Sequence, residues 1–412
     1  MTPRTTEPTG LDRSGRRRVT GALCLTQITS WGVLFYAFPV LAPGISADTG
    51  WGLERVMGAF TVGQLMAALM GIWVGRHVDR HGPRWLMGGG SVLAAAAVVL
   101  VARAPGLAWF TVAWLVAGAA MSMVLYPPAF AAITRWHGDG DRVRALTILT
   151  VAGGLASTVF APLTATLSGW LGWRDTFLVL ALVLAVVTVP AHLWGLRGSW
   201  PSAPTATGAR SRPRTVIVSP AFIALVGALT LTALSAFAVV VNLVPLLAER
   251  EISLTTAGVV LGLGGVGQVV GRLGFGVLNR RLSPRSRTVL VIGVLAVTTA
   301  ALGLLEALVP IVCVVLLAGA SRGMFTLIQA TAVTDRWGTG HYGQLTAVLT
   351  APITVAIALA PWVGAQLAAL LGSYSVAFLA LAAVNAAAVG LSLLSHPRAL
   401  GQHRGKHGRS SI

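Results

Sequence analysis

Long apolar stretches separated by short polar turns run along almost the whole chain. A helix of about 20 apolar residues crosses roughly 30 Å of hydrocarbon, and twelve stretches are long enough to do so. They lie at residues 19–42, 55–75, 84–103, 107–134, 142–169, 174–196, 218–247, 255–279, 286–306, 308–334, 343–371 and 375–395. None shows the period-two alternation of a transmembrane β-strand. The pattern therefore predicts an all-α integral membrane protein with twelve transmembrane helices.

The polar turn after the second stretch returns in altered form after the eighth. Gly75–Arg84 and Gly276–Arg285 share a leading glycine, a central arginine and a closing Pro-Arg. A long repeat of this kind in a membrane chain predicts two pseudo-symmetric six-helix bundles. Other pairs at the same spacing are Gly118 with Gly319 and Arg135-Trp136 with Arg336-Trp337.

One long polar interruption divides the twelve stretches into six and six. Residues 198–214 are rich in Pro, Ser, Thr and Gly, a composition typical of a flexible linker. The predicted organisation is a cytoplasmic tail at 1–18, a six-helix bundle at 19–196, a cytoplasmic linker at 197–217, a second six-helix bundle at 218–395 and a basic cytoplasmic tail at 396–412.

Composition agrees with a membrane protein, because 55% of residues are hydrophobic, 10% are charged and the mean hydropathy is +0.78. The formal charge of +18 could suggest nucleic acid, but most Lys and Arg residues fall in alternate loops, beginning with the N-terminus. By the positive-inside rule, this places both termini in the cytoplasm of a protein of the cell membrane. No nucleic-acid partner is expected. The two cysteines lie inside apolar stretches, so neither a disulfide framework nor a metal site is predicted.

The first turn carries a pattern with a known parallel. Gly75-x3-Asp79-Arg80-x-Gly82-x-Arg84 resembles the signature between helices two and three of the major facilitator superfamily, and the resemblance covers about residues 19–395. It implies the major facilitator fold and secondary transport. The chain is also similar to the monocarboxylate and oxalate/formate group of that superfamily, in Arg135–Gly138, Arg144–Leu146, Ala152–Ser157, Pro162, Gly172–Arg174 and Gly271-Arg272-x-Gly274-x-Gly276.

Two arginines lie within apolar stretches, while every Asp and Glu lies near a stretch end or outside. An arginine inside the bilayer costs at least about 2.5–3.5 kcal/mol, so it normally faces a cavity or a partner. Arg322 is far from both ends of its stretch, and a negatively charged substrate would neutralise it. Arg272 matches the resembling group's arginine in helix eight. The alternatives are that Arg322 is satisfied by polar groups of the protein and that Arg272 extends to the membrane surface.

Uncharged polar side chains within the stretches are further candidates for substrate contacts. Gln268 lies one turn before Arg272 on the same helix face. Gln27, Tyr36 and Asn242 could also hydrogen-bond a substrate. Such groups equally often join helices, with about 0.6–2 kcal/mol from each bond. Asn385, on an outer helix, is predicted to be structural.

Prolines and glycines predict local departures from regular packing. Tyr126-Pro127-Pro128 should break its helix, because the two prolines remove backbone donors. Gly71 with Gly75, and Gly267 with Gly271, have the small-xxx-small spacing that lets helices cross closely.

The two related turns differ in charge, since Asp79 in the first corresponds to Arg280 in the second. The family resemblance implies that Asp79 locks the two halves on the cytoplasmic side, facing the start of helix eleven. Arg280 cannot act in this way. We therefore hypothesise that Asp139 and Asp141 pair with Arg280 or Arg281 in the second half of the gate. The residues assigned to the gate are Gly75, Asp79, Arg80, Gly82, Arg84, Arg280, Arg281, Asp139 and Asp141.

These observations predict a secondary active transporter that works by alternating access on a small organic anion, such as a monocarboxylate. The alternative is efflux of drug-like or hydrophobic molecules, and a more remote one is a receptor that transports nothing. We expect a monomer in the lipid bilayer that is not an enzyme and holds no cofactor or metal. A co-transported proton is left open, because no acid or histidine is seen in the middle of a stretch.

Overall fold

A computed structural model describes residues 11–137, 139–200, 214–337 and 342–395, and every regular element within them is helical. The first half contains α1 (Arg13–Trp31), the π-helix η1 (Gly32–Tyr36), α2 (Ala37–Thr49), α3 (Leu53–His81), α4 (Arg84–Ala102), α5 (Leu107–Val124), α6 (Tyr126–Trp136), α7 (Asp139–Gly154) and α8 (Ala156–Gly195). The second contains α9 (Arg214–Ile217), α10 (Pro220–Glu249), α11 (Leu254–Arg281), α12 (Pro284–Leu304), α13 (Leu308–Thr331), α14 (Thr334–Trp337), α15 (Tyr342–Leu371) and α16 (Tyr374–Leu394).

Eleven helical segments of the described chain are long and apolar enough to span a membrane. One of them, Arg144–Gly195, has 52 residues, far more than the roughly 20 that one crossing needs. Gly172 divides it, because its φ of 73° is left-handed and reverses the chain within α8. The related Gly372, with φ 83°, makes the same turn between α15 and α16. The fold therefore has twelve membrane-crossing helices, as the apolar stretches predict.

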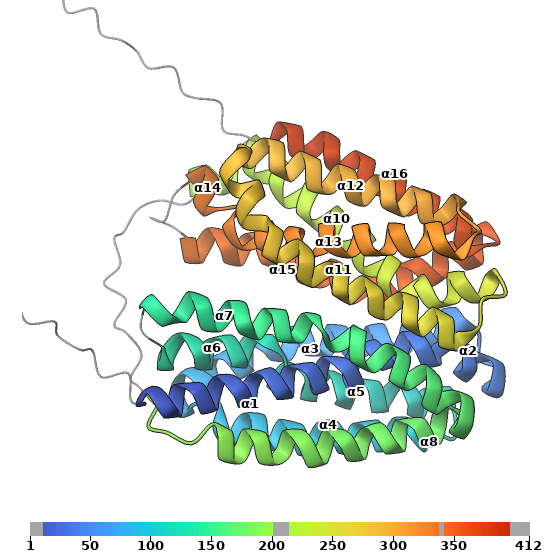
Figure 1. Cartoon of the computed structure of the whole chain (residues 1–412), viewed down its shortest axis with the longest axis horizontal. Helices are drawn as coiled ribbons and strands as arrows, with labels where there is room; N and C mark the ends of the chain where they lie inside the picture. The colour runs from blue at the N-terminus through green and yellow to red at the C-terminus, as the bar shows by residue number, and fades with distance from the viewer. Residues whose placement is uncertain (1–10, 138, 201–213, 338–341, 396–412) are drawn as a thin grey trace, which may run out of the picture.

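The helices form two bundles, one from α1–α8 and one from α10–α16, as Figure 1 shows. We call the end that carries Asp79, His137 and Asp335 the basic end, and the end that carries Gly50, Gly172 and Gly372 the opposite end. The chain limits of the two domains and the linker stay predictions, and α9 lies within the range assigned to the linker. The helix α1 begins at Arg13, earlier than the predicted tail boundary, because Asp12 caps it by accepting a bond from the Gly15 amide at 2.7 Å.

The bundles meet near the opposite end and diverge toward the basic end (Figure 1). Where the bundles meet, α11 packs against α8, and α3 packs against α15. Glycines allow this approach: a Cβ on Gly258 would lie 2.9 Å from the Ala161 carbonyl oxygen. The Thr158 hydroxyl donates to the Gly262 carbonyl at 2.9 Å, and the Trp362 amide donates to the Thr61 hydroxyl at 3.2 Å.

The predicted break at Tyr126-Pro127-Pro128 is confirmed. Helix α5 ends at Val124, Leu125 is extended, and α6 starts at Tyr126. The Val124 carbonyl accepts a 2.7 Å hydrogen bond from the Gln27 side-chain amide, a bond from outside its own helix at the site of the break. Next to this break, the first membrane-crossing helix widens into the π-helix η1. Gly32 has no side chain there, which leaves room for the Phe160 ring.

Within each bundle, a pair of glycines at equivalent positions lets two helices pack closely. A Cβ on Gly118 would lie 1.9 Å from the Gly63 carbonyl oxygen, and one on Gly319 would lie 2.2 Å from the Gly264 carbonyl oxygen. The predicted close crossing at Gly267 and Gly271 is confirmed, with α13 backbone oxygens 2.2 and 2.0 Å from their added Cβ atoms. The prediction for Gly71 and Gly75 is wrong in this structure, because nothing lies within 4 Å of either added Cβ. Both face open space in the half of α3 where the bundles diverge.

The substitution Gly319→Ala should destabilise the protein. The new methyl group meets a backbone oxygen rather than a flexible side chain, so α11 and α13 must separate, at a cost of about 1–3 kcal/mol. The measurement is the midpoint of thermal unfolding of the purified protein in detergent.

Gly293→Ala is the matched control, because an added Cβ there has nothing within 4 Å. It should leave the midpoint unchanged or raise it slightly through better helix propensity. Equal midpoints for the two variants would contradict the close packing of Gly319 against Gly264.

Candidate functional site

Arg322 lies in the middle of α13 and has only 7% of its surface exposed. Within the described residues, its guanidinium group has neither a hydrogen bond nor an ion-pair partner, although Tyr36 and Arg272 lie within electrostatic range. Removing a charge from water without a partner is costly, and inside a membrane the usual solution is a counterion or a water-filled cavity. Arg322 is therefore a group that would gain from an added anion.

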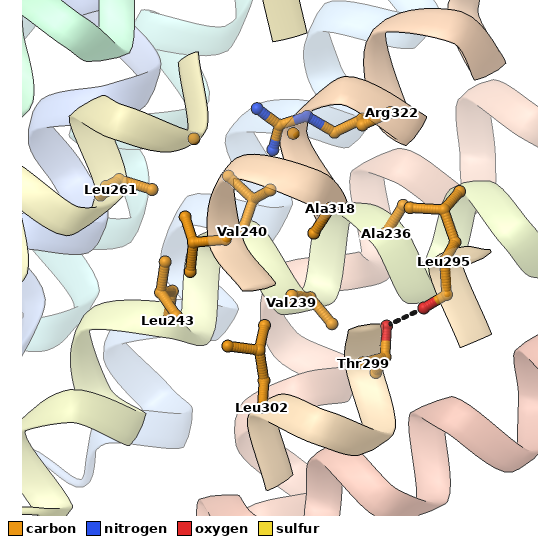
Figure 2. Close-up of a pocket in the computed structure, with 13 residues that line it drawn as sticks. Ala236, Val239, Val240, Leu243, Leu261, Leu295, Thr299, Leu302, Ala318 and Arg322 are labelled. Atoms are coloured by element: carbon orange, nitrogen blue, oxygen red, sulfur yellow. Dashed lines mark hydrogen bonds between the residues drawn. The ribbon is translucent and has the colours of Figure 1, made fainter. Parts of the chain in front are cut away.

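A small cavity borders Arg322 inside the second bundle. Its volume is about 30 Å³, and side chains of α10, α11, α12 and α13 line it. Figure 2 shows Arg322 at one end of this lining and Leu302 and Thr299 at the other. The remaining lining side chains are apolar, and the Thr299 hydroxyl donates to the Leu295 carbonyl at 2.7 Å. At a minimum of about 10–15 Å³ for each water, this space has room for no more than two or three water molecules, and it is too small for an organic substrate.

Arg272 connects the two bundles. Its Nη1 donates to the Thr150 carbonyl on α7, and its guanidinium group lies within electrostatic range of Tyr126 on α6. A Cβ on Gly154 would lie 3.1 Å from Nη1, so the glycine leaves room for the guanidinium group. The Nε atom is buried and has no hydrogen-bond partner in the described chain. Arg272 thus reaches across the interface, and it does not extend only toward the membrane surface.

The structure gathers Tyr36, Tyr126, Arg272 and Arg322 into one group, which we call the arginine–tyrosine cluster. Aromatic side chains surround it, and the Trp31 and Tyr126 rings have centroids 5.1 Å apart. Two guanidinium groups and two phenol hydroxyls can bind a carboxylate, since arginine presents paired donors that match its two oxygens. Sequence reasoning missed Tyr126 as a functional residue and noted it only as part of a helix break. Its position at the start of a broken helix was the available signal.

The three amide side chains have mainly structural contacts. Gln27 is fully buried and satisfies the Val124 carbonyl, while Asn242 donates to the Ala238 and Pro361 carbonyls at 2.9 and 3.4 Å and so joins α10 to α15. Gln268 is 8% exposed, and its Oε1 has no partner within the described residues. The side-chain oxygens of Gln27 and Asn242 also have no partner among the described residues, and Gln268 is the one of the three that lies one turn before Arg272 on α11. Asn385 donates to Ser235 at 2.9 Å, a helix-joining contact.

At the basic end, Asp79 pairs with Arg135 of its own bundle, at 2.8 Å. The Arg135 guanidinium carbon lies 5.1 Å from the centroid of the Trp200 ring, and the Trp200 indole donates to the Asp79 carbonyl at 3.2 Å. Gly82, with φ 80°, presents its bare Cα to the same ring, since a Cβ there would lie 3.2 Å from Trp200. The Trp136 indole donates to the Ser199 carbonyl at 3.0 Å. The start of the predicted linker is therefore attached to the Asp79 turn.

In the second bundle, the acid of the corresponding ion pair lies at a different position in the sequence. Position 280 is arginine, and Asp335 on α14 pairs instead with Arg287 on α12. Arg336, the counterpart of Arg135, donates to the Ser395 carbonyl at 3.1 Å and to the Thr288 hydroxyl at 3.2 Å. Burial lowers the pKa of Arg336 to about 10, so it stays charged at neutral pH.

The other residues assigned to the gate are not brought together across the bundles. Arg80, Arg280 and Arg281 are exposed, and Arg84 donates to the Leu193 carbonyl at 2.8 Å. Asp141 lies 3.8 Å from Arg16. The side chain of Asp139 and the side chains at the start of α15 lie outside the described residues.

The described residues contain no group of three or more His, Cys, Asp or Glu side chains placed to hold a metal ion. What the fold offers is a cationic, aromatic group buried between two membrane bundles. Comparisons with known proteins agree with this view. The family model for the Major Facilitator Superfamily matches residues 23–351, so the chain belongs to this superfamily of membrane transporters.

Two solved structures share the fold over nearly the whole chain. One is a bacterial homologue of the human lysosomal transporter Spinster in an inward-facing and occupied conformation, with 15% identity, a TM-score of 0.76 and coverage of 93% of this chain and 97% of the other. The other is a point mutant of the nucleoside transporter NupG, with 12% identity, a TM-score of 0.73 and coverage of 92% and 99%. A curated protein of Thermoproteus tenax, an uncharacterized 38 kDa protein in the 23S RNA operon, is 30% identical over 158 residues. The match covers 38% of this chain and 41% of that relative.

The substitution Trp200→Ala should loosen the Asp79 turn. It removes an indole hydrogen bond and the contact with Arg135, together worth about 1 kcal/mol, or roughly fivefold in a local opening equilibrium. Amide hydrogen exchange of residues 78–82 should become faster by that factor.

Trp85→Ala is the control, because Trp85 lies 4.8 Å from the Arg84 guanidinium carbon but is 69% exposed. Its removal should not change exchange in the turn. If Trp200→Ala exchanges like the wild type there, the attachment does not stabilise the turn.

Proposed function

We propose that the protein is a secondary active transporter that moves a small organic anion, such as a monocarboxylate, by alternating access. The observation that carries this proposal is Arg322, a buried guanidinium group inside the membrane without a partner among the described residues. A bound carboxylate would supply the missing counterion.

The charge around the cluster favours an anion over a cation. Arg272 lies within electrostatic range of Arg322, and the two positive groups repel each other. Every Asp and Glu in the described helices lies near a helix end. An anion between the two arginines would relieve the repulsion, whereas a cation would increase it.

The arrangement of the bundles supports alternating access. If the basic end is cytoplasmic, as the distribution of arginine predicts, the two bundles meet toward the outside and diverge toward the cytoplasm (Figure 1). Arg272 lies at the inner limit of the closed contact, through its bond to Thr150. In this proposal the protein is a monomer of the cell membrane, has no enzymatic activity and belongs to the monocarboxylate and oxalate/formate group. Whether a proton accompanies the substrate depends on groups near the helix ends.

Efflux of a hydrophobic molecule is the second candidate. Apart from Arg322 and Thr299, the cavity next to Arg322 is lined by apolar contacts, which a hydrophobic molecule could use only if the cavity enlarges during the transport cycle. In that case Arg322 would act through water in the cavity, and its removal would change transport little.

Arg322→Ala should lower uptake of the transported anion by at least about tenfold. Loss of one partner from a buried charge pair costs about 2–5 kcal/mol, and Arg322→Lys should restore part of the uptake because it keeps the charge but loses the paired donors. The measurement is initial uptake of labelled monocarboxylates into liposomes that contain the purified protein.

Arg103→Ala, an exposed change far from the cluster, serves as the control and should transport normally. Unchanged uptake in both Arg322→Ala and Arg272→Ala would reject the anion site. Export of apolar compounds without carboxylate uptake would select the second candidate.

In the proposed gate, Asp139 and Asp141 pair with Arg280 when the basic end is closed. Reversing the charges on both sides should therefore restore the pair. Asp139→Arg with Asp141→Arg should hinder that closure, so transport falls and a cysteine placed at the exposed Ala347 is labelled faster. Adding Arg280→Asp should reverse both effects, because the pair is restored with opposite signs.

The labelling uses a Cys24→Ser and Cys313→Ser background, which removes both native cysteines. Arg285→Asp, at another exposed arginine of the same end, should not rescue. Failure of Arg280→Asp to restore either measurement would remove Asp139 and Asp141 from the gate.

A further inference from the structure

A crevice between α1 and α7 at the basic end concentrates positive charge. Its volume is about 470 Å³. Four arginines line it, Arg13, Arg16, Arg17 and Arg144, together with one acid, Asp141. The described residues that line the crevice all belong to the first bundle, and none is a member of the arginine–tyrosine cluster, although Cys24 at its inner end lies within electrostatic range of Tyr126.

Asp141, the one acid among the described lining residues, offsets only part of this charge. It lies 3.8 Å from Arg16, which also has a further interaction, and 66% of the Asp141 side chain is exposed, so this pair is long and open to solvent. The neighbouring Arg18 has a different role, because it donates to the Gly195 and Arg197 carbonyls at 3.3 and 2.6 Å and anchors the end of α8. Excess positive charge thus remains at the mouth of the crevice.

The crevice becomes apolar with depth along α1. Below the arginines, the Thr20 hydroxyl lies 3.2 Å from His137 Nε2. Burial lowers the pKa of His137 below its ordinary value, so this layer is polar but neutral at pH 7. Cys24 and Ile148 follow, and Ile148 is 44% exposed. From Arg13 to Cys24 the helix rises about 16 Å at 1.5 Å per residue, enough for a phosphate group and the first part of an acyl chain.

The related half of the protein lacks this arrangement. In the register that aligns Gly75 with Gly276, Arg13 corresponds to Arg214, but Arg16, Arg17 and Arg144 correspond to Ile217, Val218 and Leu345. The topology rule alone requires positive loops in both halves, and it does not explain arginines gathered around one crevice. A ligand specific to the first half does explain them.

We propose that this crevice binds an anionic phospholipid of the inner leaflet. The arginines hold the phosphate, with paired donors that match its oxygens, and the acyl chain lies along Cys24 and Ile148. A basic pocket between transmembrane helices that continues into an apolar surface recognises both parts of such a lipid. A soluble phosphate compound would use only the first part. The site does not depend on which substrate is transported.

Fluorescence quenching tests this site directly. The reporter is a bimane dye on Ile148→Cys, in the Cys24→Ser and Cys313→Ser background, with the full chain in nanodiscs. Phosphatidylglycerol with a doxyl group on its acyl chain should quench the dye on the order of tenfold more effectively than doxyl-labelled phosphatidylcholine at the same mole fraction. The preference should disappear when Arg16, Arg17 and Arg144 are all changed to Gln, and it should partly return when they are changed to Lys.

The matched control changes three exposed arginines of the same end, Arg76, Arg197 and Arg285, to Gln, with the same loss of net charge. It should keep the preference. If both triple variants lose the preference for phosphatidylglycerol equally, the lipid is attracted to the positively charged end in general, and the proposed site is wrong. Relief of quenching by millimolar inorganic phosphate would identify a soluble phosphate ligand and overturn the lipid proposal. Equal quenching by the two lipids in the dye-labelled protein that keeps all its arginines would also overturn it, without reliance on either triple variant.

Discussion

The whole structure depends on satisfying backbone hydrogen bonds where no water is available. Regular helices meet this requirement within themselves, so each departure from regularity needs a local solution. The departures in the first bundle gather around one place: the π-helix η1 and the break between α5 and α6 flank Tyr36 and Tyr126. Gln27 satisfies the carbonyl at the break. The irregular backbone therefore lies next to the arginine–tyrosine cluster, where protein replaces lipid and a polar group can be tolerated.

The number of helices and the internal repeat were predictable because both follow directly from the order of residues along the chain. Apolar length gives the crossings, and the repeat paired Gly118 with Gly319, which the structure places in equivalent close contacts. The burial of Arg322 also followed from its depth in an apolar stretch. The partners of side chains on other helices were less accessible to this reasoning. Spacing tells which residues share a helix face, but it does not tell which helix lies opposite, so the proximity of Tyr126 to Arg272 was missed and Gly75 was placed in a crossing that it does not make.

The altered charge in the repeated turn has a simple structural counterpart. In the first bundle the acid is on the turn and the arginine is on α6; in the second, Asp335 is on α14 and Arg287 is on α12. The Asp79–Arg135 pair of the first bundle thus has a counterpart in the Asp335–Arg287 pair of the second, but the two pairs join different elements. Only the first ties down its turn, through Asp79, whereas Arg280 and Arg281 stay exposed. Duplication preserved the backbone packing more strictly than the charges, because a Cβ between two backbones cannot be accommodated, while a surface ion pair can move by one helix.

Trp200 changes the effective length of the connection between the bundles. Its contacts with Asp79 and Arg135 fix the chain to the first bundle beyond the end of α8, as far as residue 200. The covalent length of residues 201–213 is at most about 45 Å at 3.3–3.6 Å per residue. In the proposed alternating access, a link of this length would not limit the rotation of one bundle against the other. The pivot would then be the glycine-lined contact of α8 with α11, where Gly258 and Gly262 let the two surfaces touch without interlocking side chains.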